Sequence, residues 1–271
     1  MHVLSQNREC DTVLAQTLLY GGVTVRVDAW DEFGNTPFHL ALHYGNAKMV
    51  ELLLKHGANP NFVNGAQMVP LHVISRRDRY GNPAELFFGV AADEMYLSMK
   101  VDVRDNKGNT PLHYFLQRGL KRVVDLLLKR GVDPNLAGAG GGNCLHILCR
   151  QQCDGELIDA FFEVLNDRRQ LMQVNARDER GDTPLHLALQ HNDKAMAELL
   201  LRSGGDALQA NNEGDTPLLM MSRNHDECRD LLDILSGLTL YQPQTVQVDG
   251  AVRTLRLSAP SSEEFFRPRI I

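Results

Sequence analysis

A four-residue motif recurs at a nearly fixed interval along the chain, and this periodicity constrains the fold more than any other feature. The last position of the motif advances by 33, 41, 33, 40 and 33 residues. A period in this range indicates stacked units, none of which can bury its apolar face alone. The versions of the motif are Thr36–His39, Val69–His72, Thr110–His113, Asn143–His146, Thr183–His186 and Thr216–Leu219.

Other residue types keep fixed distances from this motif. Eight residues before its last position stand Asp31, Asn64, Asp105, Gly138, Asp178 and Asn211. Five residues before it stand Gly34, Gln67, Gly108, Gly141, Gly181 and Gly214. Asp followed by Gly three residues later is turn chemistry, because the carboxylate caps backbone groups and glycine tolerates positive φ.

Within one repeat the sequence predicts two helices. Thr110 is an N-cap candidate, Pro111 suits the first helical position, and Gly131 is a helix stop. Apolar residues between them are spaced to give two buried helix faces. These residues are Leu112, Leu116, Val124, Leu127 and Leu128.

This combination of turn, two helices and a Thr-Pro-Leu-His signature resembles the ankyrin repeat family. The resemblance covers residues 1–237 and implies an all-α repeat fold: an ankyrin-type α-solenoid with β-hairpin fingers. About six to seven repeats are expected, with short (33) and long (40–41) units alternating. It also implies that the motif histidines tie neighbouring turns together by hydrogen bonds. These are His39, His72, His113, His146 and His186.

The resulting domain boundaries follow the motif. A truncated first repeat is expected at 1–30, because Met1–Ser5 aligns with the first helix of a repeat. The chain would then be a piece of a longer array, or its first helix pair would be poorly ordered. Further repeats are expected at 31–63, 64–104 (long), 105–137, 138–177 (long and degenerate), 178–210 and 211–237, followed by a non-repeat tail at 238–271.

Two segments depart from the regular pattern in length. The extra residues of the long units fall in 89–99 and 163–172. About seven residues correspond to two helical turns, so the second helix of each long unit is expected to be two turns longer, with a longer loop as the alternative. In the tail, alternation around Asp249-Gly250 allows a marginal hairpin, although a disordered segment or the start of another module is favoured.

Two repeats also depart from the pattern in residue type. Gln67 and Val69 replace the turn glycine and the cap threonine, so the turn and the cap of that repeat should be weaker. Asn143-Cys144 replaces Thr-Pro, and the finger before it is glycine-rich at 138–142. That run lacks the Gly-Lys-Ser/Thr ending of a phosphate loop, so a floppy finger is favoured over a nucleotide site.

Composition limits the classes of function. The net charge is -6 and the pI about 5.9, which disfavours nucleic-acid binding. No apolar run approaches a membrane span, and the start of the chain does not resemble a secretory signal. Five cysteines at uneven spacing fit a reducing cytoplasm or nucleus better than a disulfide framework.

Enzyme, metal and cofactor sites are not expected. The chain lacks the Gly-x-Ser-x-Gly, dinucleotide and His-Glu-x-x-His motifs, so no catalytic residue, cofactor or enzymatic activity is predicted. One candidate metal site consists of Cys144, His146, Cys149 and Cys153. Their spacing matches no common zinc module, and their side of the helix is expected to be buried, so packing is favoured.

The resemblance implies that a partner protein binds to the finger tips and to the exposed part of each first helix. The exposed pair on that helix follows the motif end by four and five residues. These positions hold Arg and His but no Asp or Glu, which suggests an acidic, phosphorylated or polar partner segment, with a solvated row as the alternative. The candidates are His43, Tyr44, Arg76, Arg77, Gln117, Arg118, Arg150, Gln190, His191 and Arg223.

Finger tips supply four further candidates. Trp30 is the only tryptophan, and Phe33 occupies the tip position where Lys107 and Arg180 stand in later repeats. Two exposed aromatic residues on one finger would anchor an interface. The alternative is that they cover the edge of the incomplete first repeat.

The sequence therefore predicts a non-enzymatic scaffold that binds a protein partner. Inhibitors and ubiquitin-ligase adaptors of the ankyrin type are alternatives, as is the cytosolic ankyrin portion of a larger, possibly membrane, protein.

Overall fold

The computed structural model describes residues 1–6, 26–75, 99–151, 155–167, 171–223, 225–238, 240–248 and 251–258. The chain divides into two compact units. Unit 1 comprises residues 1–139 and 155–170, and unit 2 comprises residues 140–154 and 171–271. Each unit is described by itself.

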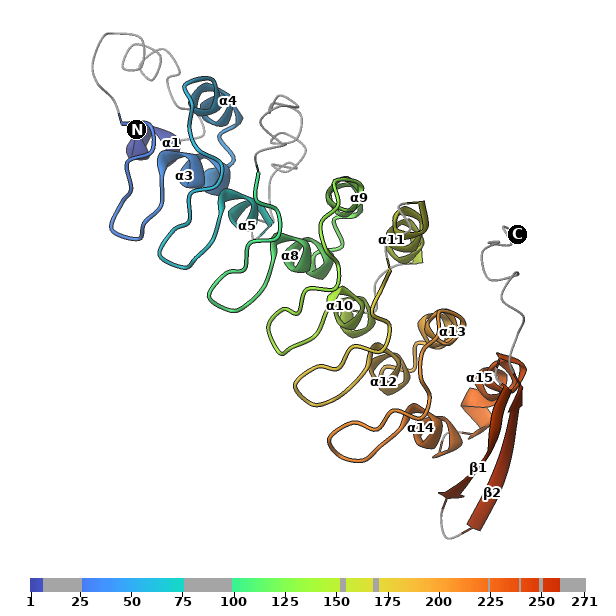
Figure 1. Cartoon of the computed structure of the whole chain (residues 1–271). Coiled ribbons are helices and arrows are strands. Elements are labelled where there is room, and N and C mark those ends of the chain that lie inside the picture. Colours follow the sequence, from blue (N-terminus) through green and yellow to red (C-terminus); the bar gives the residue numbers. More distant parts are fainter. Residues whose placement is uncertain are drawn as a thin grey trace. The chain divides into compact units, whose positions relative to one another are not determined.

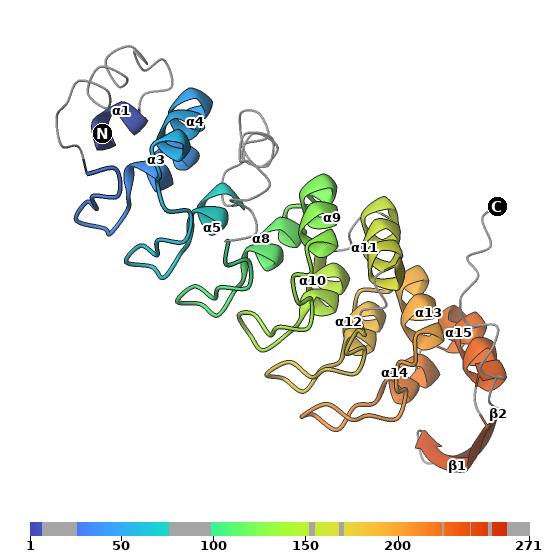
Figure 2. The same ribbon diagram turned by 45° about the horizontal axis from the view of Figure 1, so that its top comes forward.

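Unit 1 is built from successive helix pairs with a finger before each pair. The first helices α1 (His2–Gln6), α3 (Pro37–Tyr44), α5 (Pro70–Ser75) and α8 (Pro111–Gln117) pack against one another in chain order. They lie in a row, and the fingers project side by side from them (Figures 1 and 2). The second helices are α4 (Ala47–Lys55), α9 (Lys121–Lys129) and α11 (Gly155–Asp167).

Unit 2 repeats this arrangement and ends in a hairpin. Its first helices are α10 (Cys144–Gln151), α12 (Pro184–Gln190) and α14 (Pro217–Arg223), and its second helices are α13 (Lys194–Arg202) and α15 (His225–Leu238). The strands β1 (Leu240–Val248) and β2 (Ala251–Ser258) pair antiparallel, with Val248 opposite Ala251. Strand β2 packs against α15, and the two strands form the hairpin that the sequence allows in the tail.

The first helices begin as the sequence predicts. Thr110 is the N-cap of α8, Pro111 is its first residue, and the backbone N–H of Thr110 donates to Nδ1 of His113 over 3.1 Å. Asn143 replaces threonine in front of α10, and its Oδ1 accepts from the backbone N–H of Leu145. Val69 has no side-chain oxygen, so its hydrogen bonds with His72 are made by its backbone N–H and carbonyl groups alone. The weaker cap expected at this repeat is therefore confirmed.

Apolar residues of both helices in each pair form the core. Leu112, Leu116 and Leu127 are fully buried, as the helical spacing predicts. The largest buried side chains are Phe38, Phe115 and Phe161, one from each of α3, α8 and α11. Cys144 and Cys149 are buried on α10, which agrees with a packing role.

Five of the six fingers end in a tight turn closed by one side chain. In the first finger, Oδ1 of Asp31 accepts the backbone N–H of Phe33 and of Asn35, over 2.9 and 2.8 Å. Asn64, Asp105, Asp178 and Asn211 accept the equivalent pair of N–H groups in their own fingers. The fingers have hairpin turns, but regular strands occur in the described residues only at β1 and β2.

The glycine after this turn is needed for its backbone conformation. Gly34 and Gly108 have φ of 76° and 82°, a region that side chains with a Cβ rarely adopt. Gln67 occupies the same position with φ of 57°. At Gly34 there is a second reason, because an added Cβ would lie 2.7 Å from the backbone nitrogen of Gly65 in the next finger.

Gly138 has a packing role that differs from that of the Asp or Asn it replaces. A Cβ here would lie 2.7 Å from Oδ1 of Asn109 and from Cδ2 of His113. Oδ1 of Asn109 instead accepts the backbone N–H of Ala139, over 2.9 Å. The side chain of the preceding repeat therefore binds this finger in place of the missing acid.

Four of the five motif histidines each contact a carbonyl of the following finger. The ring Nε2 of His39 lies 3.1 Å from the carbonyl oxygen of Met68, and Nε2 of His72 lies 3.1 Å from that of Asn109. His146 and His186 contact Asp182 and Asp215 in the same way. His2 also contacts the carbonyl of Asn35, over 3.1 Å, so α1 occupies the place of a first helix.

The hydrogen-bond partners fix the charge state of these rings. A backbone N–H can only donate, so Nδ1 of His39 accepts from Thr36, while Nε2–H donates to the carbonyl of Met68. Both ring nitrogens are therefore used by the neutral form. Burial lowers the pKa of His39 to about 4, and it also lowers the pKa of His72 and of His146.

The second long repeat, expected at 138–177, has a longer second helix than the short repeats. Helix α11 has 13 residues, whereas α9 and α13 have 9. Within the described residues, the second helix is lengthened toward its C-terminal end, as predicted, by about one turn, and residues 168–170 beyond it lie outside the described residues. Most of the extra segment expected in the first long unit, 89–98, lies outside the described residues.

We predict that Gln67→Gly raises the free energy of unfolding by about 0.5–1 kcal/mol, because it relieves left-handed strain at little loss of contacts. The matched control is Gly108→Ala, where an added Cβ meets only ordinary contacts at 3.8 Å. It should lower the stability by about 1 kcal/mol through the strain alone. Urea denaturation followed by circular dichroism measures both. A stabilising Gly108→Ala would refute the role of φ.

Acid should weaken the fold through His39. The unfolded chain binds a proton near pH 6.5, whereas the folded ring binds one only near pH 4. Stability is therefore unaffected above pH 6.5 and decreases as the pH falls toward 4, by about 2 kcal/mol at pH 5 for this one ring. Urea denaturation at pH 7.5 and pH 5.0 should show a smaller pH effect in His39→Gln than in the wild type. Equal pH effects would contradict this.

Candidate partner-binding surface

Most of the sequence-predicted binding residues lie at exposed positions. His43 and Tyr44 end α3, Gln117 ends α8, and Gln190 and His191 lie at the end of α12. Arg118 is half-buried. Arg76 and Arg77 lie outside the residues with described side chains. The list as a whole stays a prediction.

The first finger carries two large exposed aromatic side chains. Trp30 is 63% exposed and Phe33 is 66% exposed. The guanidinium carbon of Arg26 lies 5.9 Å from the centroid of the Trp30 ring, which is a cation–π distance. Both rings are exposed among the described side chains, and the anchor role stays a prediction.

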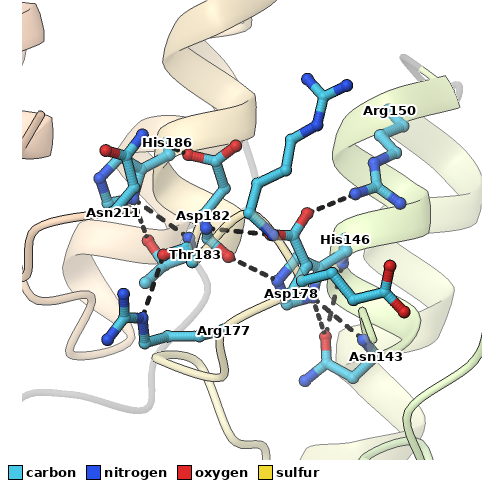
Figure 3. Close-up of polar contacts among 12 residues, drawn as sticks. Asn143, His146, Arg150, Arg177, Asp178, Asp182, Thr183, His186 and Asn211 are labelled. Atoms are coloured by element: carbon cyan, nitrogen blue, oxygen red, sulfur yellow. Dashed lines mark hydrogen bonds and ion pairs between the residues drawn. The ribbon is translucent and has the colours of Figure 1, made fainter. Parts of the chain in front are cut away.

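Two arginines of the first-helix row are paired with acids. Arg150 at the end of α10 forms an ion pair with Asp178, whose side chain is 1% exposed (Figure 3). Arg223 at the end of α14 lies 2.8 Å from Asp215. Both acids belong to fingers, so the surface is less positively charged than the residues of the first helices alone indicate. These two arginines form ion pairs within the protein.

The cationic side chains of the fingers also differ in whether they are paired with another residue. The guanidinium of Arg177 donates to the carbonyl of Gly181 and to Oδ1 of Asn212 in the next finger. Arg104 occupies the same place two repeats earlier, but there the next finger offers Ala139, which has no side-chain acceptor. Within the described part of the chain, the Arg104 side chain has no hydrogen bond or ion pair.

Lys107 and Arg180, at the finger tips, are likewise exposed. Their backbone N–H groups close the turns, and their side chains form no hydrogen bond or ion pair with described residues. Arg104 was not among the sequence-predicted binding residues. It can be identified from the following finger. Asn212 there provides an acceptor for Arg177, whereas Ala139, at the matching place after Arg104, provides none.

Other kinds of site are not visible in what the structure describes. Across the residues with assigned positions, no group of three or more His, Cys, Asp or Glu side chains is placed to hold a metal ion. Cys153, which was weighed with Cys144 and His146, is outside these residues. No described helix has the length and apolar character needed to cross a membrane.

Comparison with known protein families gives a consistent match. The model of the single ankyrin repeat matches residues 33–65 and 107–139. The model of three consecutive ankyrin repeats matches residues 145–237. Together these matches span more than half of the chain.

Several relatives are much longer than this chain. The human transient receptor potential cation channel subfamily A member 1 is 30% identical over 177 residues, which are 64% of this chain and 15% of the relative. The mouse B-cell lymphoma 3 protein homolog is 29% identical over 216 residues, which are 78% of this chain and 44% of the relative. The palmitoyltransferase AKR1 of Lachancea kluyveri is 26% identical over 187 residues, which are 67% of this chain and 24% of the relative. The chain thus spans less than half of each.

A solved structure shows the same fold. The crystal structure of the ankyrin repeat domain of Bcl-3 covers 84% of this chain and 96% of its own length, with a TM-score of 0.65 and 24% sequence identity. At this identity the likeness concerns the fold alone.

Replacing Arg150 with Met should lower the free energy of unfolding by about 1–3 kcal/mol, because it leaves the buried carboxylate of Asp178 without its cation. The matched control is Arg180→Met, at an exposed side chain without a described partner, which should change stability by less than about 0.5 kcal/mol. Thermal or urea denaturation measures both. Equal effects of the two substitutions would show that the ion pair contributes nothing.

Proposed function

Since this chain belongs to the ankyrin repeat family, we propose that it is a non-enzymatic scaffold that binds a protein partner. Its finger tips and the exposed ends of its first helices form the binding surface. The ankyrin repeat is an interaction fold, and the repeats make up most of the chain. One relative is an enzyme, so the absence of catalytic activity is proposed for this chain and not for any longer protein that contains such repeats.

The observation that supports this proposal best is that the polar groups of the finger backbone are hydrogen-bonded within the protein. Five of the six turns are closed by an Asp or Asn of the same finger, and neighbouring fingers are joined by hydrogen bonds such as that from Gly65 N–H to the carbonyl of Phe33, over 2.8 Å. The tip side chains Phe33, Lys107 and Arg180 take no part in this network and remain exposed. A row of preorganised, exposed side chains loses little conformational entropy when a partner binds.

We further propose that the partner segment is acidic or phosphorylated. Lys107 and Arg180 support this, because they are the tip cations that no described acid neutralises. The pairing of Arg150 and Arg223 argues that these two residues contribute less to the partner site than their sequence positions suggest. For the compartment, the odd and scattered cysteines support a cytoplasmic or nuclear place.

A second candidate is the ankyrin portion of a larger, possibly membrane, protein. Similarity to a cation channel of which this chain spans 15% supports it. The scaffold role is common to both candidates. An inhibitor or ubiquitin-ligase adaptor remains a prediction of the family resemblance alone.

Affinity capture from a cell lysate tests the scaffold proposal. The bait variant carries Trp30→Ser, Phe33→Ser, Lys107→Glu and Arg180→Glu, and the control variant carries Lys48→Ser and Lys194→Ser at exposed positions of the second helices α4 and α13. We expect proteins that bind the wild type and the control to be reduced at least about tenfold on the finger variant. Unchanged capture by the finger variant would rule out this surface.

A further inference from the structure

Three consecutive fingers of unit 1 carry two parallel rows of exposed side chains. One row is the residue just before each turn: Trp30, Val63 and Arg104. The other row is the tip residue, at Phe33, Ala66 and Lys107. All six residues are exposed, with Trp30 and Phe33 each more than 60% exposed.

Backbone hydrogen bonds hold these three tips in contact. The N–H of Gly65 in the second finger donates to the carbonyl of Phe33 in the first, over 2.8 Å. The N–H of Asn106 in the third finger donates to the carbonyl of Ala66 in the second, over 3.2 Å. The side chains of Asn64 and Asn35 add a bond of 2.9 Å between the first two fingers. The three fingers lie side by side in this order (Figures 1 and 2), so both rows run along neighbouring tips.

Chemical character changes along this surface. The first two fingers present Trp30, Phe33 and Val63, an apolar end, whereas the third presents Arg104 and Lys107, a cationic end. The first finger also has the exposed acid Glu32, and Arg26 lies against the Trp30 ring, so this finger has no excess of positive charge.

The acids near the cationic end are already engaged. Asp105 is 8% exposed and accepts hydrogen bonds from the hydroxyl of Tyr114 and from the backbone N–H of Lys107. Asp102 accepts the backbone N–H of Asp133, and burial raises its pKa. Arg104 and Lys107 therefore face outward with no described acid beside them.

We propose that this fingertip strip binds a protein segment that has an apolar anchor at one end and acidic side chains at the other. The apolar residues insert between Trp30, Phe33 and Val63, and the carboxylates pair with Arg104 and Lys107. The proposal rests on the scaffold function and specifies its partner. Glu32 fixes the direction, because a carboxylate placed over the first finger would meet a like charge.

The geometry also sets the spacing. First helices in contact lie about 8–10 Å apart, so the first and third fingers are separated by about 16–20 Å. An extended segment advances about 3.3 Å per residue, so the acids should follow or precede the apolar anchor by about five or six residues.

Selection from a phage-displayed library of random 16-residue peptides tests this directly. We expect the enriched peptides to carry a large apolar residue and, about five or six positions away, at least two Asp or Glu. Enriched peptides should be measured individually by fluorescence anisotropy at low and moderate salt, with the full chain as the binding protein.

Two variants and one control locate the contacts. Arg104→Glu with Lys107→Glu should weaken an enriched peptide about tenfold or more, and replacing the peptide's acids with Lys should restore binding to this variant. Trp30→Ser should weaken the peptide by a similar or larger factor. Lys48→Glu, at an exposed position of the second helix α4, should leave the affinity unchanged. Circular dichroism melting checks that each variant is folded.

Peptides with this pattern whose binding follows the charge swap would support the inference. Enriched peptides that lack acids, or that bind the charge-reversed variant as tightly as the wild type, would overturn it while leaving the scaffold function intact. Enrichment of no peptide at all, together with unchanged lysate capture by the finger variant, would overturn both.

Discussion

The hydrogen bond from a neutral histidine ring to the carbonyl of the following repeat is the contact on which the finger arrangement depends. His39 shows why it is specific: the N–H of Thr36 must find an acceptor at Nδ1, and the carbonyl of Met68 must find a donor at Nε2. Only the neutral tautomer with its proton on Nε2 serves both. One side chain thus caps its own helix and fixes the distance to the next finger.

Exposure at the finger tips follows from this arrangement. The polar groups of the fingers are hydrogen-bonded by the histidines, by the turn acids and by backbone groups of neighbouring tips. A tip side chain such as Phe33 is therefore not needed for these hydrogen bonds. Such positions are free to differ between repeats and to determine what binds. The contrast between Arg177, which is bound to the next finger, and Arg104, which is not, shows that one neighbouring residue decides between a structural and a surface cation.

Much of the fold could be predicted from the sequence, because its determinants are local and periodic. The turn at Asp31–Gly34, the cap at Thr110 and the helix stop at Gly131 depend on residues a few positions apart, and each appears as expected. The pairing of Arg150 with Asp178 could not be predicted from the spacing, since it depends on how the end of one helix meets the next finger. Periodicity alone also leaves open how a seven-residue insertion divides between the helix and the connection that follows it, so the sequence predicts a longer α11 without determining its length.

Native-state hydrogen exchange at the backbone amides of Gly65 and Asn106 tests the central claim most directly. These two N–H groups join the first three fingers of unit 1 at their tips and belong to no helix. If the histidine contacts hold the fingers in register, both amides should be protected to about the same degree as the amides of α3, and His39→Gln should reduce the protection of Gly65 first. Exchange of both amides at the rate of an unstructured loop in the wild-type protein would contradict the account.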